Sequence, residues 1–290
     1  MMIRQIAFTK MVASGNDFVV VDQRRRITLA KPGLFAAKSC DRRYGAGADG
    51  LLVLEKSKRA DMRMRIFNPD GSEPAMCGNG IRCAAFFAAY APSGRIHPKV
   101  KQIKIETKAG IIWAVVDKGG IKIKMTSPKG IKLNLPIKIN QRKLNLNFIN
   151  SGVPHAVIFV EGLDKIDIVN IGRQIRFHKR FLPAGTNVDF VQIIDDNNIK
   201  LRTYERGVED ETLACGTGTV AAAIISVIHN PQLDFNLDKN MKSNQLSVET
   251  RSGEILSVEV DRIKNKFKNI WLKGKAQIVY SGFYPNRDYI

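Results

Sequence analysis

Cysteine is scarce in this sequence, and long apolar runs are absent. The 290 residues contain four cysteines, with no Cys-x-x-Cys pair and no Cys/His cluster at zinc spacing. The longest apolar stretch, Val220–Ile228, falls well short of the roughly 20 residues that span a membrane. The first residues lead straight into an alternating strand pattern, without the features of a signal peptide. We therefore expect neither a disulfide scaffold nor a membrane protein, but a soluble cytoplasmic one.

Acidic residues are also few, since 27 Asp and Glu face 46 Lys and Arg, which gives a net charge of +19. Such a charge invites a nucleic-acid partner. However, the basic residues are spread along the chain, are not interleaved with aromatic residues, and match no zinc-finger, basic-zipper or RNA-recognition signature. We expect no nucleic-acid partner, and a basic nucleic-acid-binding protein stays only as an alternative from another class.

What the sequence does contain is an internal duplication. The segments Met64–Gly80 and Leu201–Gly218 each run from a β-patterned stretch through a glycine-bearing acidic loop to Cys-Gly-x-Gly. An alanine-rich apolar stretch follows each of them. A second pair of segments, Asn16–Asp22 and Asn187–Asp195, is also similar. The duplication predicts two similar domains.

The periodicity of each half predicts an α+β fold with two pseudo-symmetric domains. In each domain, mainly antiparallel strands should form a barrel-like sheet around a central helix. The central helices are expected at 81–91 and 219–228, and more amphipathic helices near 32–41 and 165–179. The predicted N-terminal domain, residues 1–127 plus 276–290, carries Cys77, and the predicted C-terminal domain, 128–275, carries Cys215.

Cys-Gly-x-Gly before a helix places a thiol at the helix N-terminus, where unpaired N–H groups and the helix dipole favour negative charge. We expect the pKa of Cys77 and Cys215 to be lowered there. A buried cysteine in a tight turn is the alternative interpretation of one such motif, but two motifs in duplicated positions favour function. Cys40 and Cys83 lie in helical patterns and are expected to be small buried residues.

Two thiols suit the inversion of a carbon. One thiolate removes a proton from one face, and one thiol supplies a proton to the other face. Two helix N-termini can stabilise the negative charge that grows on a substrate carboxylate. No metal or pyridoxal cofactor is then needed.

These residues resemble the diaminopimelate epimerase family over essentially the whole chain. The matching segments are Gly15–Phe18, Gly45–Gly50, Arg65–Glu73, Cys77–Cys83, Gly152–His155, Tyr204–Gly207 and Ala214–Gly218. The two Cys-Gly-x-Gly motifs alone also fit proline racemases. The segment Gly15–Phe18, together with Glu205–Gly207, favours the diaminopimelate epimerase family over the proline racemases.

The resemblance implies interconversion of LL- and meso-diaminopimelate, in lysine and peptidoglycan precursor synthesis, with Cys77 and Cys215 as the two bases. It implies that His155 and Glu205 tune them. It also implies a homodimer with Tyr280 at the interface. The implied substrate-binding residues are Asn16, Asn68, Gly78, Asn79, Asn187, Glu205, Arg206, Gly216 and Thr217.

Two positions depart from many family members, which have Gln in place of Gly50 and Asn in place of Val153. They keep open a racemase of the same fold that acts on another amino acid. Structural interpretations also remain for some residues. They are a hydrogen-bonded structural histidine for His155, a solvated ion pair for Glu205 and Arg206, and turn residues for Asn16 and Asn187.

Overall fold

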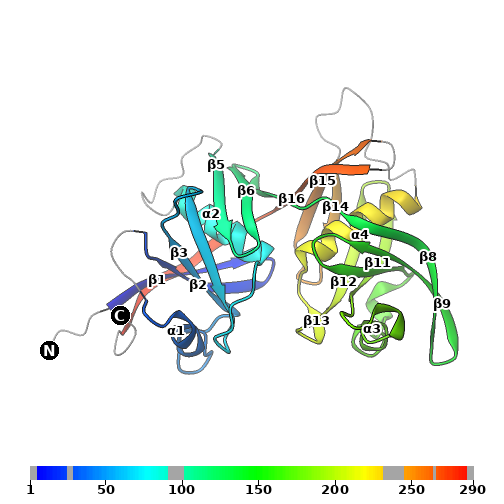
Figure 1. Ribbon diagram of the computed structural model, residues 1–290, viewed down its shortest axis with the longest axis horizontal. Helices are drawn as coiled ribbons and strands as arrows, with labels where there is room; N and C mark the ends of the chain where they lie inside the picture. Colours follow the sequence, from blue (N-terminus) through cyan, green and yellow to red (C-terminus); the bar gives the residue numbers. More distant parts are fainter. Residues whose placement is uncertain (1–4, 25–28, 91–100, 231–244, 264–265, 286–290) are drawn as a thin grey trace. The chain divides into compact units, whose positions relative to one another are not determined.

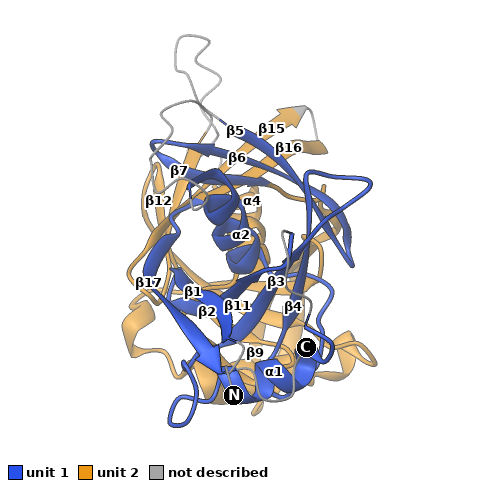
Figure 2. Ribbon diagram, turned by 90° about the vertical axis from the view of Figure 1, so that its left-hand side faces the viewer, with its two compact units in different colours: residues 1–123, 274–290 blue, residues 124–273 orange. Residues whose placement is uncertain are grey.

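The computed structural model describes residues 5–24, 29–90, 101–230, 245–263 and 266–285. The chain divides into two compact units, residues 1–123 with 274–290 and residues 124–273 (Figure 2). The domains proposed from the sequence were 1–127 with 276–290, and 128–275.

The first unit is one curved sheet around one helix. Its elements are β1 (Gln5–Ala13), β2 (Asn16–Asp22), α1 (Pro32–Ser39), β3 (Gly50–Glu55), β4 (Met62–Phe67), α2 (Gly78–Tyr90), β5 (Lys101–Thr107), β6 (Gly110–Asp117), β7 (Gly120–Lys124) and β17 (Gln277–Pro285) (Figure 1). The strands follow one another in the order β17-β1-β2-β3-β4-β5-β6-β7. The pairs β2–β3 and β4–β5 are parallel, and the others are antiparallel. Figure 2 shows α2 enclosed by these strands.

The second unit repeats this plan. Its elements are β8 (Lys129–Ile139), β9 (Arg142–Asn150), β10 (Pro154–Phe159), η1 (Leu163–Lys165), α3 (Ile168–Arg176), η2 (Lys179–Phe181), β11 (Asn187–Asp195), β12 (Asn198–Glu205), β13 (Asp210–Thr212), α4 (Gly216–His229), β14 (Gln245–Glu249), β15 (Ile255–Ile263) and β16 (Lys266–Gly274) (Figure 1). The order β8-β9-β10-β11-β12-β14-β15-β16 has its parallel pairs, β10–β11 and β12–β14, at the same places as the first unit. The predicted duplication and α+β fold are therefore confirmed. The second pair of similar segments is not part of the repeat, however, because Asn16–Asp22 forms β2, whereas Asn187–Asp195 forms β11, which takes the place of β3 in the strand order.

The composition of the central helices explains their position. Every residue of α4 from Gly218 to Val227 is buried, and the small side chains of Ala221–Ala223 let strands approach the helix from several sides. The strands β2 and β3 lie between α1 and α2, which explains why Leu51–Leu54 form a continuous apolar run. Cys40 and Cys83 are buried, as the sequence predicted.

Within the described ranges, no helix is long and apolar enough to span a membrane.

Candidate active site

Cys77 lies immediately before α2, at the position that caps the helix. Its carbonyl oxygen accepts the hydrogen bond of the Ile81 N–H at 2.9 Å. The thiol-bearing residue is half-buried, as is Gly78, whereas Asn79 is buried. The first N–H groups of a helix have no partner within the helix. The thiol therefore sits beside a set of backbone donors that can bind a carboxylate.

A chain of polar side chains supports this end of α2. Arg82, which is fully buried, donates from Nη2 to Asn79 Oδ1 at 2.9 Å. Asn79 Nδ2 donates to Asn16 Oδ1 at 2.8 Å, and Asn16 Nδ2 donates to Asp49 Oδ2 at 2.8 Å. The structure thus brings two of the implied substrate-binding residues, Asn16 and Asn79, into direct contact.

Asn68 lies at the end of β4, in the turn that leads toward Cys77. Its backbone N–H donates to the Ser72 carbonyl at 2.9 Å, and its Nδ2 donates to Ser72 Oγ at 3.0 Å. Gly71 has a φ of +84°, which favours glycine at this tight turn. These hydrogen bonds hold Asn68 and the turn to Ser72 in place, and the chain continues from this turn to Cys77.

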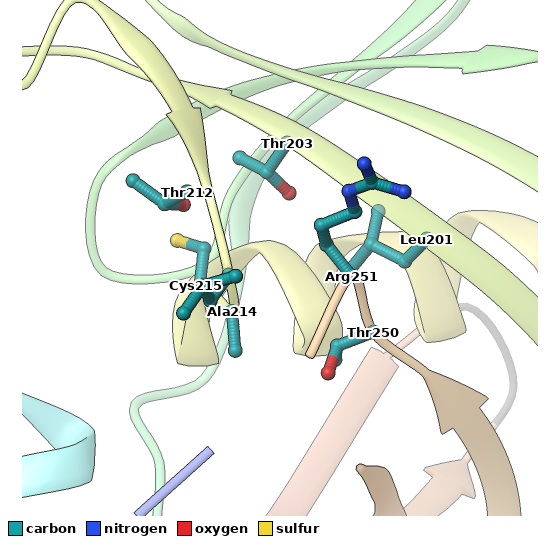
Figure 3. Close-up of a pocket in the computed structure, with 8 residues that line it drawn as sticks. Leu201, Thr203, Thr212, Ala214, Cys215, Thr250 and Arg251 are labelled. Carbon is teal, nitrogen blue, oxygen red and sulfur yellow. The ribbon is translucent and has the colours of Figure 1, made fainter. Parts of the chain in front are cut away.

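Cys215 caps α4 in the same way that Cys77 caps α2. Its carbonyl accepts the Thr219 N–H at 2.8 Å, and its sulfur accepts the Gly218 N–H at 3.4 Å. The Thr217 hydroxyl lies 3.4 Å from Sγ. Only 6% of the residue is exposed, and it lines a small hollow with Thr203, Thr212 and Arg251 among others (Figure 3).

His155 reaches this thiol through Thr217. Its Nε2 lies 3.0 Å from Thr217 Oγ1, and its Nδ1 lies 2.7 Å from Asp189 Oδ2. The register of the sheet produces this arrangement, because His155 pairs with Asn187 on β11 and Asp189 pairs with Thr203 on β12. Thr203 Oγ1 donates to Asp189 Oδ1 at 2.8 Å. His155 and Asp189 are both fully buried.

The electrostatics of Cys215 differ from the prediction. Burial raises the pKa of its thiol well above the usual range, and the carboxylates of Glu205 and Asp189 raise it further. The Thr217 hydroxyl and the Gly218 N–H oppose this rise. The expected lowering of the pKa is therefore wrong for Cys215, because desolvation and two nearby carboxylates outweigh the helix N-terminus.

Glu205 itself has a raised pKa. Burial is the main cause, while a hydrogen bond from Thr212 and the proximity of His155 work in the opposite direction. Glu205 thus interacts electrostatically with both His155 and Cys215.

Asn187 and Arg206 are held in the loop ahead of Cys215. Asn187 is 3% exposed, and its amide donates to the Pro154 carbonyl at 3.1 Å and accepts from the Arg206 N–H at 2.8 Å. Arg206 Nη1 donates to the Ala184 carbonyl at 3.0 Å. The buried side-chain amide of Asn187 therefore links β10 to the loop that carries Arg206.

Among the described residues, Tyr280 has no hydrogen bond to either cysteine or to the side chains around them. It lies on β17, where its hydroxyl donates to the Ala46 carbonyl at 3.0 Å. Its ring packs edge-on against the Phe8 ring, with the two ring centroids 5.9 Å apart. Gly50, one of the departures, begins β3. A Cβ there would lie 3.0 Å from the Phe67 carbonyl oxygen and 3.5 Å from the Phe18 ring, so a larger residue needs a local shift.

Two residues of the site were not singled out from the sequence, Asp189 and Arg82. The signal for Asp189 was present, because a carboxylate stands between Val188 and Phe190 in an apolar strand. The alternation of a strand puts Asp189 on the same face as Asn187. Within the described ranges, no group of His, Cys, Asp or Glu side chains is arranged to hold a metal ion.

Comparison with solved structures shows the fold. A hydroxyproline epimerase from Agrobacterium vitis superposes with a TM-score of 0.70 at 15% identity, over 99% of this chain and 95% of that chain. A Bacillus anthracis protein of the PhzF phenazine biosynthesis family also gives a TM-score of 0.70, at 20% identity, over 97% of this chain and 99% of its own.

Sequence comparison is more specific. The family model for diaminopimelate epimerase matches residues 8–131 and 147–279. The diaminopimelate epimerase of Aquifex aeolicus is 40% identical over 95% of this chain and 96% of its own length. That of Methanocella arvoryzae is 40% identical over 96% of both chains. The chain therefore belongs to the diaminopimelate epimerase family.

Proposed function

We propose that this protein is an isomerase that epimerises LL-diaminopimelate to meso-diaminopimelate with Cys77 and Cys215 as its two acid–base groups. One observation carries the proposal: two equivalent helices, α2 and α4, each begin directly after a cysteine in a Cys-Gly-x-Gly motif. The names of the relatives favour this substrate over another amino acid.

The reaction needs one proton removed and one supplied. A thiolate takes the α-proton from one face of the carbon, so that the Cα–H bond breaks and an S–H bond forms. The other thiol gives its proton to the opposite face, and a new Cα–H bond forms. The raised pKa of Cys215 favours Cys215 as the thiol that donates and leaves Cys77 as the first base. In this mechanism, neither a metal nor an organic cofactor takes part.

The negative charge that develops on the α-carboxylate needs donors that are already in place. The N–H groups that begin α2 and α4, at Gly78, Asn79, Gly216 and Thr217, supply them. Within each unit, the helix itself holds its donors in place, so each helix N-terminus can stabilise this charge without local reorganisation.

The distal end of diaminopimelate carries a second amino group and a second carboxylate. Arg206 suits the distal carboxylate, because a guanidinium can form paired hydrogen bonds with two carboxylate oxygens. We assign Asn16, Asn68 and Asn187 to the remaining polar groups, since an amide can both donate and accept. Glu205, near His155 and Cys215, is suited to a substrate ammonium as well as to tuning the thiol.

We also propose that the protein acts as a cytoplasmic homodimer with β17 at its interface. Four large apolar residues of this strand are exposed in the single chain, Ile278 (41%), Val279 (56%), Tyr280 (44%) and Phe283 (68%). Neighbouring residues of a strand point to opposite faces, so apolar side chains occupy both faces of β17. An exposed apolar strand favours association with a second copy.

The test is an assay of the purified protein on LL-diaminopimelate without any added cofactor, with the two isomers separated by chromatography. Formation of meso-diaminopimelate, abolished in Cys77→Ala and in Cys215→Ala, supports the proposal. Turnover of proline or hydroxyproline instead of diaminopimelate would show a different substrate. Loss of activity on chelation, with recovery on zinc addition, would contradict the cofactor-free mechanism.

A further inference from the structure

The two half-sites are built on the same plan, and the third residue after each cysteine shows what lies beneath the helix N-terminus. In the first unit, this residue is Gly80. A Cβ added there would lie 3.0 Å from Leu52 Cδ2 and 3.7 Å from Ile66 Cδ1. Leu52 and Ile66 are paired across β3 and β4. The capping turn of Cys77 therefore rests on hydrocarbon.

In the second unit, the equivalent residue is Gly218. A Cβ added there would lie 2.7 Å from Asp189 Oδ1 and 3.2 Å from Thr203 Oγ1. Asp189 and Thr203 are paired across β11 and β12, as Leu52 and Ile66 are across β3 and β4. The capping turn of Cys215 therefore rests on a buried carboxylate, and the two half-sites are chemically unequal.

With a neutral His155 ring and an ionised Asp189, the donors and acceptors fit the following arrangement. An ionised carboxylate only accepts, so the proton on His155 belongs on Nδ1, which faces Asp189 Oδ2 at 2.7 Å. The other ring nitrogen, Nε2, is then an acceptor. Both of its neighbours can donate to it, the Thr217 hydroxyl at 3.0 Å and Asn187 Nδ2 at 3.4 Å.

The same logic reaches Cys215. A threonine hydroxyl has one proton, and in this arrangement it goes to His155 Nε2. Thr217 Oγ1 can then only accept from Cys215 Sγ, which lies 3.4 Å away, so the sulfur carries a proton. When Cys215 has given up its proton, the Thr217 hydroxyl can turn to the thiolate instead, at the expense of its bond to His155.

We propose that Asp189 is a positioning residue of the epimerisation: it fixes His155 as the Nδ1–H tautomer and, through Thr217, keeps Cys215 as the proton donor. This inference rests on the proposed function. The first unit has Leu52 where the second has Asp189, so this carboxylate acts on Cys215 and not on Cys77. The duplication therefore supplies two like groups, and Asp189 makes their resting protonation states different.

The charges near Cys215 agree with this role. Glu205 on β12 and Asp189 on β11 both disfavour a thiolate at Cys215, in addition to burial. Arg251, the cation that lines the same hollow, lies 3.7 Å from the Glu211 carboxylate, which offsets its charge. After each turnover, Cys77 holds the proton taken from substrate and Cys215 is a thiolate. Exchange of protons with water then restores the starting state, which Asp189 favours.

The test compares Asp189→Asn with Asp195→Asn, the same change on the exposed end of the same strand. The rate of alkylation by iodoacetamide is followed against pH for each cysteine by peptide mass spectrometry. An amide at 189 can donate to His155 Nδ1, which reverses the chain of donors and favours the thiolate. In Asp189→Asn, we expect the midpoint of the alkylation-rate curve of Cys215 to move down by about one pH unit. Below the midpoint, this shift corresponds to about tenfold faster alkylation.

Cys77 in the same molecules is the internal reference. Its midpoint is expected to stay unchanged in both variants, and Asp195→Asn is expected to leave Cys215 unchanged as well. An unaltered or raised midpoint of Cys215 in folded Asp189→Asn would overturn the proposal, as would an equal shift at Cys77. The measurement needs no substrate, so its failure is distinct from a failure of the epimerase assay.

A second measurement covers the case in which Asp189→Asn does not fold. The chain has four histidines, so nitrogen-15 NMR of the wild type, with a His155→Gln variant for assignment, can report the tautomer of His155. We expect the proton on Nδ1. A proton on Nε2, whether the ring is neutral or doubly protonated, would overturn the proposal, because Thr217 would then have to donate to the sulfur.

Discussion

Arg82 and Asn79 lie three residues apart on α2, and Arg82 Nη2 donates to Asn79 Oδ1 at 2.9 Å. Residues at this spacing lie on the same face of a helix. The bond uses the acceptor end of the Asn79 amide and thereby points its donor end at Asn16. Arg82 also donates to Ser14 Oγ, in the turn just before Asn16. A fully buried cation thus orients two amides assigned to the substrate.

Replacement of Arg82 by Met is expected to weaken both folding and substrate binding. The change leaves buried acceptors on Asn79 and Ser14 without their donor, at a cost of about 1–3 kcal/mol in the free energy of unfolding. Because the two amides lose their fixed orientation, KM for LL-diaminopimelate should rise. Urea unfolding and steady-state kinetics measure these effects. Arg59→Met, on a side chain that is 69% exposed, is the control, and equal behaviour of the two variants would contradict the role of Arg82.

Replacement of Thr217 separates its hydroxyl from its shape. Thr217→Val keeps the volume but removes the only group that contacts both His155 and Cys215 at hydrogen-bond distance among the described residues. We expect kcat to fall by about tenfold or more, since one hydrogen bond to a charged group is worth roughly 1.5–3 kcal/mol. Thr217→Ser, which keeps the hydroxyl, should retain most of the activity. A valine variant as active as the serine variant would show that the hydroxyl has no part in catalysis.

The loop between Asn68 and Cys77 gives a stability that depends on pH. Arg65 donates from Nε and Nη2 to the two oxygens of Glu73 at 2.8 and 3.0 Å, and this bond is the main reason that the pKa of Glu73 falls to about 2. A lowered pKa in the folded state means that the contribution is complete above the ordinary value of 4.5 and is lost as the pH falls toward 2. Glu73→Gln should therefore unfold more easily than the wild type at neutral pH, and the difference should shrink through this range. Urea unfolding at a series of pH values, with the exposed Glu161→Gln as control, measures it.

The sequence alone predicted the parts that local patterns encode. Cys-Gly-x-Gly before an alanine-rich run locates both helix N-termini, because glycine, capping and helix propensity act within a few residues. The duplicated segments predict two similar domains, since the same pattern must bury the same faces twice. The helices expected at 32–41 and 165–179 are α1 and α3, which have 8 and 9 residues and are shorter than expected, α3 by more than α1.

Features that depend on packing between distant strands were missed. The strand β8 was not predicted, although apolar and polar residues alternate along most of it; most of its side chains are exposed, and the alternation marks a buried face only near its end. The raised pKa of Cys215 depends on Asp189 and Glu205, which reach the thiol only through the pairing of β11 and β12 below α4. A local rule for helix N-termini therefore predicted the wrong direction.

The two-base assignment makes the strongest prediction. If each cysteine serves one face of the α-carbon, Cys77→Ala and Cys215→Ala should both lose epimerisation. Each variant keeps one thiol, which can remove only the α-hydrogen that faces it. In deuterated water, each variant should therefore exchange the α-hydrogen of one stereoisomer with retention, and the two variants should prefer opposite isomers. Proton NMR of LL- and meso-diaminopimelate during incubation measures both exchange and inversion.

The outcome also tests which thiol begins as the base. Since Cys215 starts as the thiol in our proposal, the wild type should use Cys77 to ionise LL-diaminopimelate, and Cys215→Ala should be the variant that still exchanges this isomer. Cys40→Ala, a change at a buried cysteine of the first unit, is the control and should still epimerise. If both single variants exchange the same isomer, or if either one epimerises at a rate near that of the wild type, one cysteine is not a base. The paired mechanism would then be wrong, even though both cysteines directly precede equivalent helices.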